Sequence, residues 1–507
     1  MQHARRTARA RGWRSVLLGF TAVLACQTDP ISEPESSLSA AKGSGGGGLT
    51  SVTVTAADPD TIPTDTTLTV KIYGSGFTPG TNTVTYLFNN QVSSKVVASA
   101  VQYVSATELS TTTTVARGAA IGAYDIAVTS NGKRGIGAER MEVVVKTVLL
   151  PDYGFESNVF DINDALVAVG FAVDKTGSRR AMRWVPDGAG WSKEDLGPGM
   201  ALAVNRWGDI AGFTNDGATD CSTVSTSGGR TCRAWIRLAS GTTFDLGPIY
   251  DNGGSSLWSE SRLRLSDNGT VLANYLIPGG SAAGTPTARV QTGSNIWGEP
   301  ALLPLPSGMT GSSIGQDLSP DGEWIVGEVQ PAAGYQIPGT AWRRSMGGWT
   351  PLVVDAGQGS SVVQVQAVRS SGSMAGRVRS CNGPGCTNPS WTLVAWTAPG
   401  AAQVLLAGCV LVALNRSHVS DMNEAGHIVG DCHLPSGRGK KTVYQVTQLF
   451  WRSPTTSPIP LSLTGYVWAI NDAGVAAGRD RAQSAAYCID PYGSTADGCH
   501  AAIWLLP

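Results

Sequence analysis

The sequence predicts an all-β fold, in which a β-sandwich is followed by a seven-bladed β-propeller. The 507 residues include 63 glycines and only 15% charged side chains, a composition typical of many short strands joined by tight turns. No long amphipathic helical pattern is present. From Thr147 onward, a strand-turn-strand pattern recurs about every 50 residues, as expected for sheets that stack around an axis.

Residues 1–25 have the features of a targeting segment. Five arginines and no acidic residue accompany the apolar core SVLLGFTAVLA, which is too short to span a bilayer. The segment ends in VLAC, which resembles a bacterial lipobox and implies that Cys26 becomes the lipidated, membrane-anchored first residue of the mature protein. The alternative is an ordinary secretory signal that contains a cysteine. Gln27 is not the Asp that lipoproteins use for inner-membrane retention, so we expect an exported protein at the outer membrane or cell surface.

The segment after the signal and the net charge restrict the possible partners. Residues 26–48 are polar, with prolines early and glycines late, and are predicted to form a flexible tether. Without residues 1–25, the chain has 32 basic and 38 acidic side chains, a net charge of −6. This balance argues against nucleic-acid binding, which requires clustered Lys and Arg over phosphates.

The cysteines other than Cys26 are even in number and fall into neighbouring pairs. The expected disulfides are Cys221 with Cys232, Cys381 with Cys386, Cys409 with Cys432, and Cys488 with Cys499. Zinc binding is the alternative, but paired C-x-x-C units are absent and the histidines are scattered, so we expect no metal and no cofactor. Three pairs fall within equivalent loops of the repeats, whereas Cys409 and Cys432 would join two consecutive units.

Residues 49–146 predict about seven short strands with alternating apolar and polar side chains, which is typical of a β-sandwich. The segments VKIYGSGFTPGT and GAYDIAVTSNG resemble the IPT/TIG immunoglobulin-like family. The matching positions are Gly74, Gly76, Phe77, Gly122, Tyr124 and Val128. The resemblance implies a spacer or interaction module, and no catalytic set is visible in this segment.

Residues 147–507 are predicted to form the propeller. The turn-and-strand part of the repeat occurs as INDALVAVG (162–170), VNRWGDIAG (204–212), LSDNGTVLA (265–273), LSPDGEWIVG (318–327), VRSSGSMAG (368–376), MNEAGHIVG (422–430) and INDAGVAAG (470–478). Six copies end this strand with a glycine: Gly170, Gly212, Gly327, Gly376, Gly430 and Gly478. Each unit has two apolar faces, so it requires neighbours on both sides.

An aromatic strand follows in six of the seven copies. It carries Trp184, Trp235, Trp342, Trp396, Trp451 and Trp504, whereas the third copy has TARV at 287–290. Because the tryptophan recurs at one structural position, we expect it to pack between units; stacking on a ligand is the alternative. The last unit ends after its third strand, so residues 147–151 are predicted to supply the fourth strand and close the ring.

The repeats resemble the HAF family of extracellular bacterial repeats. INDAGVAAG with HAAIW, His500 to Trp504, is the copy most similar to that pattern, and MNEAGHIVG with QLFW is next. The resemblance implies an exported, propeller-like domain and no established reaction.

The sequence contains no convincing catalytic motif. GSSIG, Gly311 to Gly315, fits G-x-S-x-G but lies where strands rather than a helix are expected, and SPDGEW lacks the arginines of a sialidase site. We therefore expect a non-enzymatic surface protein that binds a protein or glycan through propeller loops. The alternative is a carbohydrate-active hydrolase or lyase with acidic residues at the channel mouth, where carboxylates distant in sequence would meet.

Overall fold

A computed structural model describes the chain from residue 51 onward. The described residues are 51–188, 190–214, 231–250, 263–275, 285–289, 291–293, 296–298, 301–331, 337–346, 348–354, 360–380, 390–409, 417–436, 443–462, 465–481 and 499–507. All the described residues belong to one unit, Thr50–Pro507. The expected signal, tether and Cys26 lie outside the described residues, within which no helix is long and apolar enough to cross a membrane.

The described part of the chain is all-β, and its first nine strands form two sheets that share one core. The strands are β1 (Thr53–Asp58), β2 (Thr61–Pro63), β3 (Thr66–Ser75), β4 (Asn82–Phe88), β5 (Gln91–Val92), β6 (Val96–Ser105), β7 (Glu108–Val115), β8 (Gly122–Ser130) and β9 (Lys133–Val144). Their orders are β1-β3-β7-β6 and β2-β9-β8-β4-β5. The sequence predicts about seven strands; the short β2 and β5 lack an alternating pattern long enough to detect.

The residues that carry the IPT/TIG resemblance lie in or beside this shared core. Phe77, Tyr124 and Val128 are buried in it. Gly74 lies against β1, because a Cβ there would come within 1.9 Å of the Thr53 carbonyl oxygen. Gly76 has a φ of 78°, which favours glycine. These positions therefore have structural roles in the two-sheet part.

From Lys146 onward, the described residues form seven four-stranded sheets, here called sheets 1 to 7 in chain order. Sheet 1 contains β11 (Ser157–Ile162), β12 (Ala168–Val173), β13 (Arg179–Asp187) and β14 (Gly190–Pro198). Sheet 2 contains β15 (Met200–Val204), β16 (Ile210–Thr214), β17 (Thr231–Arg237) and β18 (Thr243–Tyr250). Sheet 3 contains β19 (Arg264–Leu265), β20 (Val271–Tyr275), β21 (Thr285–Arg289) and β24 (Ala301–Leu302).

Sheets 4 to 6 repeat the same antiparallel order. Sheet 4 contains β25 (Gly311–Leu318), β26 (Trp324–Pro331), β27 (Gly339–Ser345) and β28 (Gly348–Val353). Sheet 5 contains β29 (Ser360–Val368), β30 (Met374–Ser380), β31 (Ser390–Trp396) and β32 (Val404–Leu405). Sheet 6 contains β33 (His418–Met422), β34 (Ile428–Ser436), β35 (Val443–Trp451) and β36 (Ile459–Ser462). Sheet 7 contains β37 (Tyr466–Ile470), β38 (Val475–Arg481), β39 (Cys499–Leu505) and, as its outer strand, β10 (Lys146–Leu149).

Strand β10 joins two segments that are far apart in sequence. It pairs antiparallel with β39, and Val148 lies opposite Ile503. The expected strand was 147–151, whereas β10 ends at Leu149. Leu150 still donates a backbone hydrogen bond to the Ala501 carbonyl, 2.8 Å away, but Pro151 has no N–H with which to continue the ladder.

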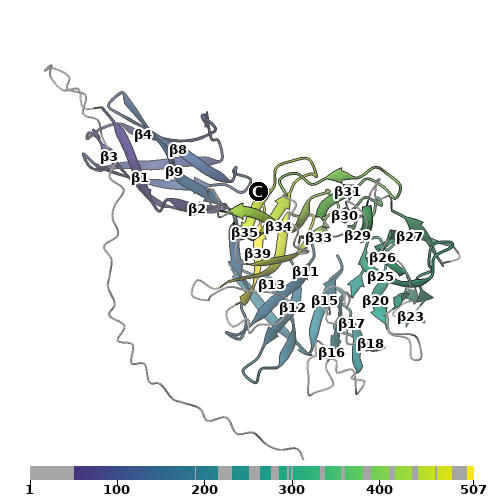
Figure 1. The fold of residues 1–507 in the computed structure, drawn as a ribbon. Helices are drawn as coiled ribbons and strands as arrows, with labels where there is room; N and C mark the ends of the chain where they lie inside the picture. The colour runs from purple at the N-terminus through teal and green to yellow at the C-terminus, as the bar shows by residue number, and fades with distance from the viewer. Residues whose placement is uncertain are drawn as a thin grey trace, which may run out of the picture. The chain divides into compact units, whose positions relative to one another are not determined.

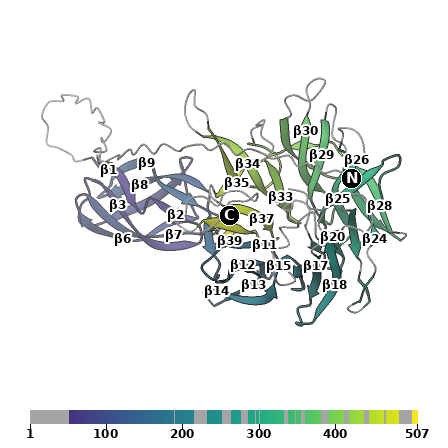
Figure 2. The same ribbon diagram turned by 60° about the horizontal axis from the view of Figure 1, so that its bottom comes forward.

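Consecutive sheets lie side by side, and sheet 7 also lies beside sheet 1 (Figures 1 and 2). Strand β11 contacts all three of β37, β38 and β39. One hydrophobic cluster joins sheets 7 and 1 and includes Val159, Met182, Ala477 and Ile503. Each sheet therefore buries its two apolar faces against two neighbours.

The repeated tryptophans lie at these sheet-to-sheet contacts. Their exposed fractions are 0% for Trp184, 7% for Trp235, 0% for Trp342, 1% for Trp396, 0% for Trp451 and 0% for Trp504. Three indole N–H groups donate to carbonyls just after the outer strand of the preceding sheet: Trp184 to Pro151, Trp342 to Pro304 and Trp451 to Ala407, at 2.7, 2.7 and 2.8 Å. The burial agrees with packing between units and leaves no open ring face for a ligand.

Sheet 3 departs from the repeat in a way that the sequence did not reveal. A two-stranded hairpin, β22 (Gln291–Gly293) with β23 (Ile296–Trp297), lies between β21 and β24. Trp297 of this hairpin packs against Phe244 of sheet 2, with ring centroids 5.5 Å apart, and its indole N–H donates to the Gly269 carbonyl. The hairpin thus supplies an indole to a sheet whose third strand has none.

The repeated glycines face a β-bulge in the first strand of their sheets. In all the sheets but sheet 3, the pairing of the first two strands shifts by one residue opposite the glycine, as between Val159 and Asp161 opposite Gly170. A Cβ on any of these six glycines would come within 1.8 to 2.4 Å of a first-strand carbonyl oxygen. The bulge, which re-aims the following side chain, therefore requires glycine opposite it.

Replacing one of these glycines is expected to destabilise the protein. In Gly327→Ala, the new Cβ would lie 1.8 Å from the Ile314 carbonyl oxygen, so the bulged strand must shift. We expect a loss of about 2–4 kcal/mol in the free energy of unfolding, measured by denaturant titration. Gly190→Ala is the matched control, because its Cβ has no neighbour nearer than 3.9 Å. Equal stabilities of the two variants would contradict the role assigned to the bulge.

Candidate functional site

A cavity with a volume of about 540 Å³ lies where the first strands of the seven sheets meet the turns that follow them. Every sheet contributes to its lining. Along these strands, the lining begins with the aromatic rings of Phe160 and Trp468. A belt of charged side chains follows, formed by Asp161, Arg264, Asp317 and Asp421. The turns come last. The lining residues used below are Phe160, Asp161, Asn163, Asp164, Asn205, Arg206, Trp207, Arg264, Asp267, Asn268, Asp317, Asp321, Asp421, Asn423, Glu424, Trp468, Asn471 and Asp472.

Three aspartates of the belt link neighbouring sheets. Asp161, Asp317 and Asp421 each follow the bulge of their strand. Their Oδ2 atoms accept backbone N–H groups of the next sheet's first strand, from Val204, Val368 and Ile470, at 2.8, 2.9 and 2.9 Å. The Oδ1 atoms of Asp161 and Asp421 accept the N–H of the following residue, at 2.8 Å in both cases. Both oxygens of these two carboxyl groups therefore accept hydrogen bonds from the backbone.

Arg264 is the one basic residue of this belt. Its Nε donates to Asp317 Oδ1 at 2.9 Å, and both side chains are largely buried. Burial acts to lower the pKa of Arg264, but the carboxylates of Asp317, Asp161 and Asp421 outweigh it and raise that pKa. Arg264 therefore stays charged and offsets part of the negative charge of the belt.

The belt carboxyl groups are held in an unfavourable environment for a negative charge. Burial raises the pKa of Asp161 to about 6, against the hydrogen bonds from Val204 and Ile162 that lower it. Burial, together with the negative charge of Asp317, raises the pKa of Asp421 to about 7. Both groups therefore titrate near neutral pH, which is the range of a general acid or base.

The turns above the belt form a second set of links, which explains the Asn-Asp pattern of the repeat. An asparagine carries both an acceptor and a donor, so it can close its own turn and also bond to a neighbour. Asn471 illustrates this, because its Oδ1 accepts the Val475 N–H at 2.8 Å while its Nδ2 donates to the Asn163 carbonyl at 2.9 Å. The same donation runs from Asn163 to Asn205, from Asn205 to Ser266, from Asn268 to Asp321 and from Asn423 to Asn471.

The acidic side chain that follows the asparagine, or Ser266 in sheet 3, reaches back to the preceding sheet and accepts a backbone N–H there. Asp164 Oδ1 accepts the Asp472 N–H at 2.8 Å, and Asp472 Oδ1 accepts the Glu424 N–H at 2.7 Å. Asp267 Oδ1 likewise accepts the Arg206 N–H at 2.9 Å. Burial first, and then neighbouring carboxylates, raise the pKa of Asp267 and of Asp472. The rim acids thus have structural partners and also repel one another.

An aromatic cluster lines the cavity below the belt. Phe160 and Trp468 are partly buried, with ring centroids 6.1 Å apart. Trp468 stacks on Tyr466 at 5.2 Å, and Tyr466 stacks on His418 at 5.9 Å. Trp468 Nε1 is buried and has no hydrogen-bond partner. The rings present an apolar surface with one unpaired donor at the bottom of the cavity.

GSSIG and His500 lie outside the residues that line this cavity. GSSIG lies at the start of β25, so no nucleophile elbow is formed. His500 Nδ1 and Ser157 Oγ both bond to Asp152 Oδ2, at 2.5 and 2.6 Å, which puts the aspartate between them. A Ser-His-Asp triad requires the histidine in the middle, so this group is better suited to fastening sheet 7 to sheet 1.

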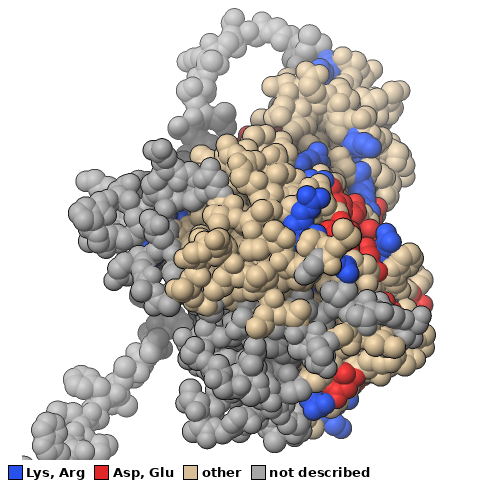
Figure 3. Space-filling model, turned by 90° about the vertical axis from the view of Figure 1, so that its right-hand side faces the viewer, with Lys and Arg blue, Asp and Glu red and all other residues tan. Residues whose placement is uncertain are grey.

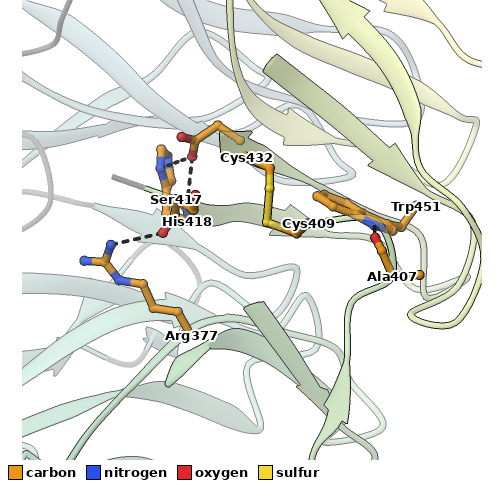
Figure 4. The surroundings of a disulfide bond; sticks show 8 residues. Arg377, Ala407, Cys409, Ser417, His418, Cys432 and Trp451 are labelled. Carbon is orange, nitrogen blue, oxygen red and sulfur yellow. Dashed lines mark hydrogen bonds and ion pairs between the residues drawn. A yellow bond between two sulfur atoms is a disulfide. The ribbon is translucent and has the colours of Figure 1, made fainter. Parts of the chain in front are cut away.

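One predicted disulfide is present in the described residues (Figure 4). Cys409 and Cys432 are bonded, with Cα atoms 5.8 Å apart, and join the end of sheet 5 to β34 of sheet 6. The bond lies beside the hydrogen bond from Trp451 to Ala407 and near His418, whose Nδ1 contacts Asp431. Cys499 is disulfide-bonded.

The remaining cysteine predictions cannot be followed in the same way. Cys221, Cys381, Cys386 and Cys488 lie outside the described residues. Cys232 lies in β17. Among the described residues, no group of three or more His, Cys, Asp or Glu side chains is arranged to hold a metal ion.

The sequence prediction missed the belt aspartates. Asp161, Asp317 and Asp421 stand two residues before the Asn or Ser that opens the turn, in DIN, DLS and DMN. This recurrence was a usable signal. It was hidden because the same position holds Ala203, Ala367 and Ala469 in other copies, and because the aspartates are more than 100 residues apart.

Figure 3 shows the charged side chains on one face of the molecule. There, acidic side chains of the described residues gather together and are flanked by Lys and Arg, with uncharged surface around them. The described residues of this face form no broad basic area.

No protein-family model matches the chain, and no curated protein matches it. Among solved structures, it is similar to a structural-genomics protein of unknown function from Bacteroides thetaiotaomicron VPI-5482, with 10% identity and a TM-score of 0.30 over 90% of this chain and 98% of that one. It is also similar to a chain from a study of two prolyl endopeptidases, with 11% identity and a TM-score of 0.38 over 67% of this chain and 46% of that one. Both similarities are too distant to assign a fold or a function.

The raised pKa of Asp421 predicts a pH dependence of stability. A carboxyl pKa of about 7 in the folded state against 3.8 when unfolded means that the folded state binds the proton more tightly. The stabilisation is complete below about pH 4 and is lost as the pH rises through about 7. Relative to Asp421→Asn, the wild-type free energy of unfolding should fall by on the order of 2–4 kcal/mol between about pH 4 and pH 8.

Chemical denaturation at several pH values measures this difference. Asp174→Asn is the control, because hydrogen bonds from Thr176 lower the pKa of the exposed Asp174. Its pH dependence should have the opposite sign, with the wild-type advantage lost as the pH falls. A constant difference between wild type and Asp421→Asn would show that this carboxyl is not held as described.

Proposed function

We propose that the protein is an exported, lipid-anchored surface protein that binds a protein or glycan ligand through a closed, seven-bladed β-propeller. In this proposal, sheets 1 to 7 are the blades, and β10 supplies the outer strand of the last one. The contacts of sheet 7 with sheet 1 and the pairing of β10 with β39 support ring closure. The two-sheet part is then the immunoglobulin-like spacer that the IPT/TIG motif implies, and the propeller repeats are of the HAF type.

The lipid anchor is the part of the proposal that only the sequence supports. The lipobox-like VLAC gives lipidation at Cys26 and places the protein at the outer membrane or cell surface, with residues 26–48 as the tether. The net charge of −6 without residues 1–25 and the acidic cavity both oppose nucleic acid as a partner.

The observation that carries a binding role is the cavity to which all seven sheets contribute. Pockets of 300–1,000 Å³ with a few convergent polar groups are typical small-ligand sites. The belt aspartates favour binding over catalysis, because Asp161 and Asp421 each accept backbone N–H groups with both oxygens. Carboxyl groups held in this way orient the strands and are poorly placed to attack or protonate a substrate.

The second candidate is a carbohydrate-active hydrolase or lyase. It is favoured by the convergence of Asp161, Asp317 and Asp421 in one cavity. It is also favoured by burial, which raises the pKa of Asp161 to about 6. Glycosidases use two carboxyl groups, one of them kept protonated near neutral pH.

A binding screen distinguishes the two candidates. The purified chain from residue 27 onward is applied to arrays of glycans and of bacterial surface proteins, and the same chain is incubated with the glycans that it retains. A binding protein gives a saturable signal and releases no new reducing ends. Turnover that disappears in Asp161→Asn, with folding intact by circular dichroism, would establish the hydrolase instead. Absence of binding across both arrays would contradict the proposed binding role.

A further inference from the structure

The acidic side chains of the cavity do not by themselves identify a ligand. Eight lining residues are acidic, namely Asp161, Asp164, Asp267, Asp317, Asp321, Asp421, Glu424 and Asp472. Only Arg206 and Arg264 are basic. Several of the acids link neighbouring sheets, so their presence has a structural reason. Their sum nevertheless leaves the cavity strongly negative, which disfavours an anionic ligand and favours a cationic one.

An unpaired donor on a residue that lines the cavity points to a ligand more directly. Trp468 lines the cavity, and its Nε1 is buried and has no hydrogen-bond partner. Trp468 is the extra residue of the β37 bulge, the position that Phe160 holds in β11. Leaving such a donor unpaired is costly, so a ligand with an acceptor oxygen at this depth would recover that cost.

The rings at the same depth define the shape of the ligand. Phe160 and Trp468 are tilted by 57° to each other and both line the cavity, so they offer aromatic faces to the apolar C–H face of a sugar ring. Trp207, which is 60% exposed, offers a further indole face at the rim. Hydroxyl groups of a sugar would donate to the belt carboxylates and accept from Trp468 Nε1.

We propose that the cavity binds an oligosaccharide of amino sugars that carry free amines, and that it discriminates against acidic sugars. This inference rests on the proposed binding function and names the class of its ligand. Phe160 and Trp468 contact the sugar rings, Trp468 Nε1 binds a ring or hydroxyl oxygen, and the acids of the turns bind the ammonium groups. No covalent step is involved.

The test uses three tetrasaccharides of similar size in isothermal titration calorimetry with the chain from residue 27 onward. They are the glucosamine tetramer, the N-acetylglucosamine tetramer and the galacturonate tetramer. The glucosamine tetramer should bind at least about tenfold more tightly than its acetylated form, since several ammonium–carboxylate pairs each add to its binding. Its affinity should fall with added salt, and the galacturonate tetramer should not bind.

Two variants separate the contribution of the acids in the turns from that of the Trp468 indole. Glu424→Gln with Asp472→Asn keeps the oxygens that accept the Ser370 and Glu424 N–H groups but removes two rim charges, and should weaken glucosamine-tetramer binding at least about fivefold. Trp468→Phe keeps an aromatic ring but removes the indole N–H, and should weaken the binding of both the glucosamine and the acetylated tetramer.

The matched control is Glu142→Gln with Asp187→Asn, which removes two exposed charges that do not line the cavity. Melting temperatures check that all the variants are folded. Equal effects of the two double variants, or binding of the galacturonate tetramer, would overturn the inference. If the glucosamine tetramer fails while another glycan or a protein gives saturable binding, the inference fails and the proposed binding role survives. If no glycan or protein binds at all, the binding role itself fails.

Discussion

The structure depends on how the backbone groups along the inner edge of each sheet find hydrogen-bond partners. The first strand of every sheet has a second strand on one side only, and its other edge meets the first strands of the neighbouring sheets. Buried N–H groups without partners are costly, so such an edge must be satisfied from outside its own sheet. Asp161, Asp317 and Asp421 do this by accepting the N–H of Val204, Val368 and Ile470. The carboxyl groups therefore lie at the centre because the backbone requires acceptors there.

This constraint accounts for several features of the repeat at once. The bulge re-aims the side chain that follows it, and the glycine opposite, such as Gly327, makes room for the bulge. The asparagine of the turn closes the turn and reaches the next sheet, and Asn471 bonds across 308 residues of sequence to Asn163. A cavity with an excess of acidic groups is the consequence, and the raised pKa of Asp161 and of Asp421, caused by their burial, follows from it.

Much of the fold could be predicted from the sequence, because local patterns encode strands and turns. The recurrence of -G strands and tryptophans identified the repeats, and residues 147–151 were assigned to the last sheet with an error of one residue at the start and two at the end. The hairpin with Trp297 could not be foreseen, because an inserted pair of two- and three-residue strands has no periodicity to detect. The cavity could not be foreseen either, since Asp161 and Asp421 meet only after the seven sheets are arranged in space. The six repeated glycines were recognised as markers of the repeat. The reason that glycine is needed there, a carbonyl oxygen within 2.4 Å of any added Cβ, can be seen only in the structure.

The central claim is that the sheets close on one another, with β10 as a permanent strand of sheet 7. Hydrogen-deuterium exchange of the backbone amides, measured by mass spectrometry on the chain from residue 27 onward, tests it most directly. Peptides that cover residues 146–150 should exchange as slowly as those that cover residues 499–505, because the two segments share one hydrogen-bonded ladder. Exchange of 146–150 at the rate of an unpaired chain, while 499–505 stays protected, would contradict the account.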